Sequence, residues 1–101
     1  MSVSITVDAT KAIITLEGRL DYTIGRVFRE GYEPLLTNPC LEKIEIDLGA
    51  ADYVDSAVLG YFLILRERVA NTKIEVYFVN SQGVVGTLLR IAGFDHLFSL
   101  R

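Results

Sequence analysis

Three polar residues of this chain stand where they could bind a charged group or carry a switch. Asp55 and Ser56 directly precede a run with helical periodicity, and Asp21 precedes an earlier one. A carboxylate or hydroxyl at the start of a helix accepts hydrogen bonds from unpaired backbone amides, and the helix dipole favours negative charge there. The same features orient a phosphate or an acidic group of a partner. These residues are therefore either helix caps or contacts to a partner.

Residue types suited to catalysis or metal binding are sparse. A pair of carboxylates such as Asp21 and Asp55 can serve acid–base chemistry or bind a divalent cation. The chain has one cysteine, Cys40, and one histidine, His96, so it offers neither a disulfide framework nor a zinc-type cluster. No Lys, His or Cys is tied to either carboxylate by a motif. We therefore expect no catalysis, no cofactor and no metal.

Charge and hydropathy limit the partners and the compartment. The net charge of −3, without a basic stripe, argues against nucleic acid as a partner. The N-terminus lacks the pattern of a signal peptide, and the longest apolar stretch, 57–65, is far short of the ~20 residues that span a bilayer. We expect a cytoplasmic protein without membrane insertion, folded as one domain over residues 1–101.

Hydrophobic periodicity predicts an α/β fold. A period of two marks half-buried strands, and apolar residues recurring at three and four mark helices. Strands separated by helices must run parallel, with the helices on one side of the sheet. We expect a mixed sheet of four to five strands, an N-terminal hairpin and then parallel strands, with three main helices. The predicted strands are 3–7, 12–17, 43–48 and 73–79. The first predicted helix starts at about residue 23, and the others span about 56–70 and 82–92. Residues 49–54 form a loop, and 94–100 form a tail packed on the body.

The second predicted helix leaves two apolar side chains next to water. Tyr61 and Ile64 fall on its outer side beside Gly60, and such a pair next to a recognition loop suits the core of a protein interface. The inward stripe of this helix is expected to comprise Val58, Phe62, Leu65 and Val69, widened by Leu59 and Leu63. The first helix is expected to bury Ile24, Val27, Phe28, Gly31 and Leu35, and to kink or end at Pro34.

Three motifs together resemble the STAS family, the small domains of bacterial anti-sigma factor antagonists. The segment Asp55-Ser56-Ala57-Val58-Leu59-Gly60 is similar to the family's Asp-Ser-Ser-Gly-Leu-Gly before the second helix. Gly18-Arg19-Leu20-Asp21 matches the Gly-x-Leu-Asp that follows the family's second strand. Residues 88–94 resemble its closing Leu-x-x-x-Gly-(Leu/Phe) pattern. The resemblance covers essentially the whole chain, in the right order of elements.

The resemblance implies a non-enzymatic regulatory module that binds an anti-sigma factor with serine kinase activity. The partner-binding residues that it implies, together with the exposed pair, are Asp21, Asp55, Ser56, Gly60, Tyr61 and Ile64. In the family the second Ser of the motif is phosphorylated and phosphorylation blocks binding, but here that position is Ala57. Either the protein stays in its binding-competent form, or Ser56 accepts the phosphate instead. We favour the first interpretation, because the two positions lie about 100° apart around a helix.

Two other functions compete with this interpretation. Within the same fold, the chain could be a STAS subunit of another assembly, such as a lipid-transport complex, without a phosphorylation switch. A phospho-aspartate receiver needs an acidic pair after its first strand, and only Asp8 is present there. The open edge of the predicted hairpin could also support a weak homodimer.

Overall fold

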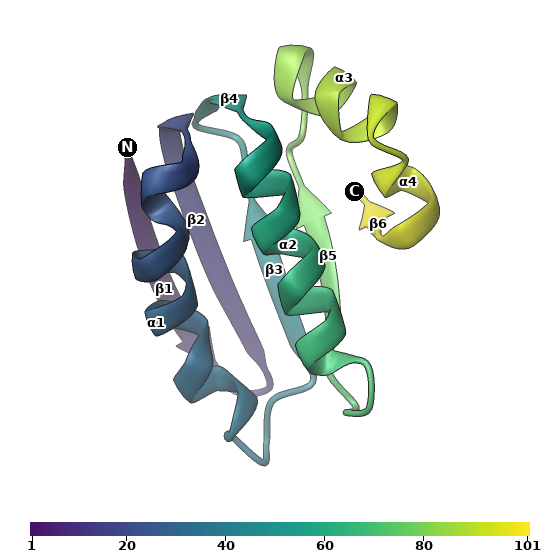
Figure 1. The fold of residues 1–101 in the computed structure, drawn as a ribbon. Coiled ribbons are helices and arrows are strands. Elements are labelled where there is room, and N and C mark those ends of the chain that lie inside the picture. The colour runs from purple at the N-terminus through teal and green to yellow at the C-terminus, as the bar shows by residue number, and fades with distance from the viewer.

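The computed structural model describes residues 1–101, which form a six-stranded mixed sheet with two long helices on one face (Figure 1). β1 (Ser2–Asp8) and β2 (Lys11–Leu20) make the predicted antiparallel hairpin. β3 (Lys43–Asp47), β5 (Glu75–Val79) and β6 (Ser99–Leu100) extend it as parallel neighbours in the order β1-β2-β3-β5-β6. The α/β class, the hairpin and the parallel strands are confirmed. The sheet has more strands than the four to five expected, because β6 and a sixth strand are too short to show a period of two.

That sixth strand, β4 (Ala51–Val54), corrects the prediction of a loop over 49–54. It pairs in parallel with the second half of β2, whose first half pairs with β3. Within the β2–β4 pairing the register shifts by one residue after Gly18, which has φ of 83° and donates its N–H to the Ala50 carbonyl at 2.9 Å. Glycine suits this position because its φ lies in the left-handed region.

The first helical segment begins as a 3-10 turn, η1 (Tyr22–Ile24), and continues as α1 (Gly25–Leu36). Pro34 lies inside α1, where its missing amide removes one main-chain hydrogen bond, and the helix ends two residues later. Val27 was expected in the buried stripe but is 57% exposed. The buried face is centred between Phe28 and Tyr32, and Val27 lies about 100° around the helix from Phe28.

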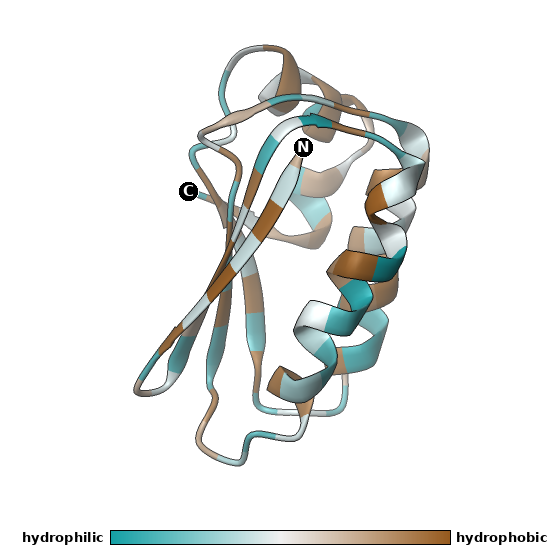
Figure 2. Cartoon of the chain, turned by 90° about the vertical axis from the view of Figure 1, so that its left-hand side faces the viewer, coloured by the Kyte–Doolittle hydropathy of each residue, from teal (hydrophilic) through white to brown (hydrophobic).

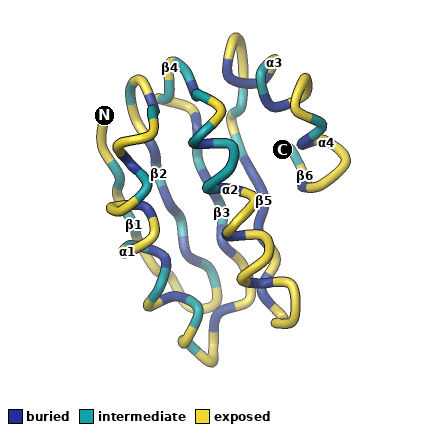
Figure 3. Tube along the Cα trace, viewed as in Figure 1, coloured by how far each residue is buried: buried dark blue, intermediate teal, exposed yellow.

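The core lies between the inner face of the sheet and the helices. α2 (Ser56–Val69) buries the predicted stripe of Val58, Phe62, Leu65 and Val69. Leu63 was expected to widen this stripe, but it is 37% exposed and points outward. Edge-to-face aromatic contacts cross the core, with ring centroids 5.6 Å apart for Phe28 and Phe62 and 5.0 Å apart for Phe62 and Phe78. Figure 3 shows the buried positions on the inner strands and on the sheet-facing side of both helices.

The C-terminal tail, 94–100, packs back on the body, as predicted. α3 (Gly83–Ile91) ends before Gly93, which has φ of 79°, the left-handed conformation expected of a residue after a helix. α4 (Phe94–Leu97) follows, and Phe94 and Phe98 are buried in the core. None of the helices combines the length and the apolar character needed to cross a membrane.

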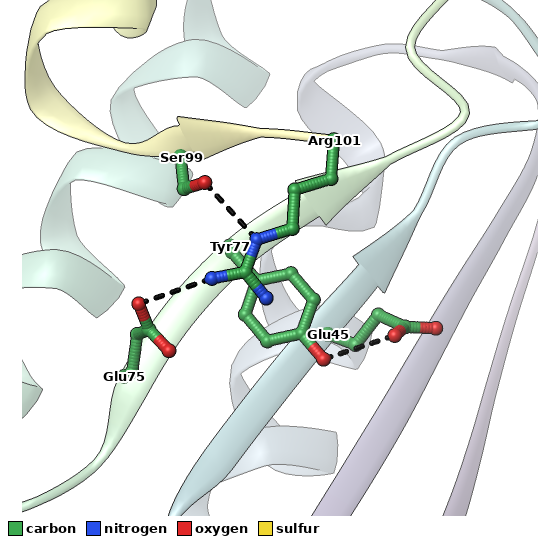
Figure 4. A network of polar contacts seen from close by, with 5 residues as sticks. All are labelled: Glu45, Glu75, Tyr77, Ser99 and Arg101. Atoms are coloured by element: carbon green, nitrogen blue, oxygen red, sulfur yellow. Dashed lines mark hydrogen bonds and ion pairs between the residues drawn. The ribbon is translucent and has the colours of Figure 1, made fainter.

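The other face of the sheet carries no helix (Figure 2). Most of its residues are polar or charged, but Ile13, which pairs with Glu45, and Tyr77 lie on it as well. Tyr77 is buried on this face under the guanidinium of Arg101, which lies 3.8 Å from its ring centroid. Its hydroxyl donates a hydrogen bond to Glu45 at 3.0 Å, and Arg101 also pairs with Glu75 at 3.3 Å (Figure 4). Burial raises the pKa of Tyr77, and Glu45 adds to this shift. These contacts hold β6 on β5 from the open face.

Candidate functional site

The two carboxylates singled out in the sequence lie side by side at one end of the sheet. Asp21 follows β2 and Asp55 follows β4, and the Asp55 amide donates to the Leu20 carbonyl at 3.1 Å. Asp21 caps η1 by accepting from the amide of Thr23 at 2.9 Å and from the Thr23 hydroxyl. These hydrogen bonds, chiefly the one from the hydroxyl, lower the pKa of Asp21. The pairing of β2 with β4 therefore brings together two caps that lie 34 positions apart in the sequence.

Asp55 joins the starts of two helices. One carboxylate oxygen accepts from the Val58 amide at 3.0 Å and caps α2. The other accepts from the Tyr22 amide of η1 at 3.1 Å. Both oxygens therefore have protein donors, and the first role of Asp55 is to fix the angle at which η1 and α2 leave the sheet.

Tyr61 was expected to lie next to water. In the structure it lies in the seam between the helices. Its hydroxyl donates to the Tyr22 carbonyl at 2.7 Å, and the residue is only partly exposed. The ring packs directly on Gly25, where an added Cβ would lie 2.6 Å from the Tyr61 ring. Gly25 therefore permits the close approach of the two helices at this end, and Tyr61 serves the fold as well as the surface.

The outer face of α2, defined here as Ser56, Gly60, Leu63 and Ile64, points away from the core. Leu63 and Ile64 each lie three or four residues after Gly60 and seven or eight after Ser56, so all four lie on one side of the helix. Ile64 is 52% exposed, Leu63 adds a second apolar side chain, and Ser56 is exposed. A Cβ added at Gly60 would meet no heavy atom within 4 Å. The neighbouring Ala57 is partly buried.

A groove of about 410 Å³ runs beside this face, between η1, α1 and α2. Tyr22, Tyr61 and Ile64 supply apolar walls, and Arg26 and Arg29 supply positive charge. Tyr22 is 68% exposed. The sequence did not single out Tyr22, Arg26 or Arg29, because the groove exists only where two distant helices meet.

An ion pair also ties α1 to α2. The Arg68 guanidinium donates to both carboxylate oxygens of Glu33, one of them at 3.0 Å. This contact lowers the pKa of Glu33 and raises that of Arg68. Two polar contacts, this ion pair and the Tyr61 hydrogen bond, therefore link α2 to α1 and η1 beside the groove.

The residue types suited to metal binding or catalysis do not gather at this end of the sheet. No three His, Cys, Asp or Glu side chains are grouped so that they could hold a metal ion. Cys40 is exposed, and His96 pairs weakly with Asp95 at 3.8 Å in α4. The two central carboxylates accept hydrogen bonds from backbone amides, and no nucleophile and base are paired.

Comparisons with known proteins agree with this geometry. The family model described as STAS domain matches residues 2–101. A STAS-domain containing protein of Pseudomonas aeruginosa is 30% identical over 93 residues, which cover 92% of this chain and 90% of that protein. The fold is similar to that of the Bacillus protein SpoIIAA, an anti-sigma factor antagonist. The TM-score is 0.75 for its unphosphorylated form, at 16% identity over 92% of this chain and 83% of that chain.

The same fold also occurs inside much larger proteins. The murine anion transporter Slc26a9 contains a region with a TM-score of 0.75 to this chain, at 14% identity. That region covers 93% of this chain but only 16% of the transporter. At such low identity, the likeness to SpoIIAA and to the transporter shows a shared fold alone.

Proposed function

The chain belongs to the STAS domain family, and on this basis we propose that it is a non-enzymatic regulatory module that binds a kinase-type anti-sigma factor in the cytoplasm. Domains of this kind bind and regulate other proteins. The binding surface proposed here is the outer face of α2 together with the adjoining groove. SpoIIAA, which shares the fold, is an anti-sigma factor antagonist that exists in a phosphorylated and an unphosphorylated form.

Gly60 carries the argument for this surface. A glycine inside a helix destabilises it by about 1 kcal/mol relative to alanine. Gly60 has no positive φ, and a Cβ there would meet nothing inside the molecule, so the fold itself does not require glycine. Close approach of a partner to the α2 backbone explains its presence, because any side chain would stand between the two surfaces.

The groove and the outer face of α2 indicate the chemistry of the partner. Leu63 and Ile64 offer an apolar centre, and Tyr22 is an exposed aromatic side chain beside it. Arg26 and Arg29 give the groove positive charge, although Arg26 also pairs with Glu30 at 2.7 Å. A partner segment with an aliphatic or aromatic anchor and a neighbouring carboxylate suits this combination.

The proposed module has no working switch at the usual position. The family resemblance assigns phosphorylation to the position of Ala57, and alanine has no hydroxyl. Ser56, the residue before Ala57, is exposed and carries a hydroxyl. It is therefore the residue that would accept a phosphate in this motif. A phosphate there would add about −1.5 to −2 charges beside Asp55, on the surface that docks. We propose that the chain remains unmodified and competent to bind.

The surface is tested by one substitution and a matched control. Ile64→Glu places a carboxylate in the proposed interface, whereas Ile91→Glu makes the same change on α3, where Ile91 is 78% exposed. Capture from the native organism should recover a partner with wild type and Ile91→Glu and lose it with Ile64→Glu. Calorimetry on the purified partner should show at least about a hundredfold weaker binding for Ile64→Glu. Equal affinity of all three proteins would remove α2 from the interface.

The captured partner and its kinase activity decide between the candidate functions. A histidine-kinase-like ATPase supports the proposal, whereas membrane transporter subunits support a role in a transport assembly. Incubation with that ATPase and ATP, followed by intact mass measurement, tests the switch. An unchanged mass agrees with the proposal, and a phosphate mapped to Ser56 would overturn it.

A further inference from the structure

β1 is an edge strand with one side free. It pairs only with β2, and no other element lies over its outer side (Figure 2). β1 and β2 are joined by a two-residue turn, Ala9-Thr10, in which Ala9 has φ of 55°. The pair that closes such a turn, Asp8 and Lys11, exchanges both main-chain hydrogen bonds. In an antiparallel pair, every second residue of a strand bonds to the neighbouring strand, and the residues between them point the other way. The main-chain groups of Val3, Ile5 and Val7 therefore point outward and are free to pair.

The features that usually protect an edge strand are missing from β1. Its seven residues, Ser-Val-Ser-Ile-Thr-Val-Asp, contain no proline, glycine or lysine, and they pair with β2 without a bulge. Proteins commonly block exposed edges with such features, because an open edge pairs readily with other strands. The single charge, Asp8, lies at the end beside the turn. β1 is therefore a regular template for another strand.

Exposed apolar side chains line the same edge. Val7 is 51% exposed, and Val27 on α1 is 57% exposed. Ile5 packs against α1 at Gly31, where an added Cβ would lie 2.5 Å from the Ile5 side chain. α1 contacts α2 along its opposite flank, through Gly25 and Glu33, so Val27 belongs to the flank that faces the β1 edge. The edge thus offers apolar surface in both the sheet layer and the helix layer.

We propose that β1 pairs antiparallel with β1 of a second copy of this chain, around a two-fold axis at Ile5. This register places Ser2 opposite Asp8, Val3 opposite Val7 and Ser4 opposite Thr6. Every apolar residue then meets an apolar residue on the helix side, hydroxyl side chains meet on the open side, and the two Asp8 carboxylates stay apart.

Other registers are poorer. A slip by one residue places the helices of the two copies on opposite faces and sets apolar side chains against polar ones. A slip by two leaves only 2–6 or 4–8 paired. The self-complementary pattern of β1 therefore favours a second copy over a strand of unrelated sequence. This surface is separate from the outer face of α2, which the dimer leaves free.

The dimer is tested by its mass and by a matched pair of lysine substitutions. At concentrations up to about 1 mM, sedimentation equilibrium should show a mass rising from 11.3 kDa towards twice that value. Val7→Lys should weaken association at least about tenfold, because a charge enters the paired edge. Val84→Lys changes a valine of similar exposure on α3 and should have no effect. Circular dichroism should show both variants folded. A wild type that remains monomeric, or equal loss in both variants, would overturn the proposal.

Cross-linking tests the register independently. Two single variants, Ser4→Cys and Thr6→Cys, are made in a Cys40→Ser background. In the proposed dimer, the cysteine of Ser4→Cys on one copy lies directly opposite that of Thr6→Cys on the other, and these two residues share no main-chain hydrogen bonds. The expected Cα separation of about 4.5 Å lies within the range that a disulfide spans. The mixture of the two single variants should form a cross-linked dimer under mild oxidation, and each variant alone should form little. Stronger cross-linking of either variant alone, or none in the mixture, would show that this pairing is wrong.

Discussion

Replacing Gly60 by alanine should stabilise the fold and weaken partner binding. The substitution adds a methyl group to the outer face of α2, where no heavy atom of the protein lies within 4 Å of the new Cβ. No internal clash opposes the gain in helix propensity. The expected increase in unfolding free energy is therefore the full difference between the two residues in a helix interior, about 1 kcal/mol. For a domain of this size, that corresponds to a rise of about 4–8 °C in Tm.

Gly86→Ala is the matched control. It is also a glycine inside a helix, so it gains the same propensity, but it is buried, and its Cβ would lie 2.3 Å from the Ser81 carbonyl oxygen. That overlap with backbone forces α3 to move, and we expect a loss of about 1–3 kcal/mol. Urea denaturation followed by circular dichroism measures both changes on the same scale. The opposite signs would show that the environment, and not the substitution, sets the outcome.

The binding half of the prediction separates a partner surface from an ordinary exposed helix. If a partner packs closely on the α2 backbone, the methyl group of Gly60→Ala should weaken binding by about tenfold, or about 1.4 kcal/mol, while the free protein becomes more stable. Calorimetry with the captured partner measures this. A more stable variant that binds as tightly as wild type would refute the argument from Gly60. A variant that is not stabilised would show that the space around Gly60 is not open to a methyl group.

Two further predictions concern the caps. Asp55→Ala should lower the unfolding free energy by about 2 kcal/mol, because it removes the α2 cap and the bond to the Tyr22 amide. Asp55→Asn should lower the unfolding free energy by about half as much, since the asparagine side chain retains one oxygen that can accept from the Val58 amide. Equal losses for the two variants in urea denaturation would show that Asp55 does not stabilise the fold through two separate hydrogen bonds. Thr23→Val should raise the pKa of Asp21 towards its usual 3.8, measurable by NMR titration, because the Thr23 hydroxyl is the main cause of the lowered value. In wild type the stability contributed by Asp21 is complete above pH 3.8 and is lost as the pH falls through the lowered pKa. In Thr23→Val the stability lost on acidification should be smaller. An unchanged pKa of Asp21 would show that the Thr23 hydroxyl is not the main cause of the lowered value.

Much of the fold could be predicted because its elements are locally encoded. The buried side of β2 and β3 can be predicted from their alternation within a few residues. The same holds for the apolar stripe of α2, which comprises Val58, Phe62, Leu65 and Val69. β4 could not be predicted, since four residues carry no clear period and the strand exists only because β2 is long enough for two partners. Val27 was misplaced because its spacing fits the apolar stripe, whereas the face that packs on the sheet is centred between Phe28 and Tyr32.

The sequence by itself determined several residues of the candidate site: Asp21 and Asp55 from their places before helical runs, Ile64 from the helical period, and Ser56 and Gly60 from the family resemblance. The tertiary structure decided what each can do. Only the approach of α1 and α2 puts Tyr61 on Gly25 and creates the groove with Tyr22, Arg26 and Arg29. Helix caps form between neighbours in the chain and can be predicted from spacing. A groove forms between side chains about 40 positions apart, and its shape depends on packing that no local pattern encodes.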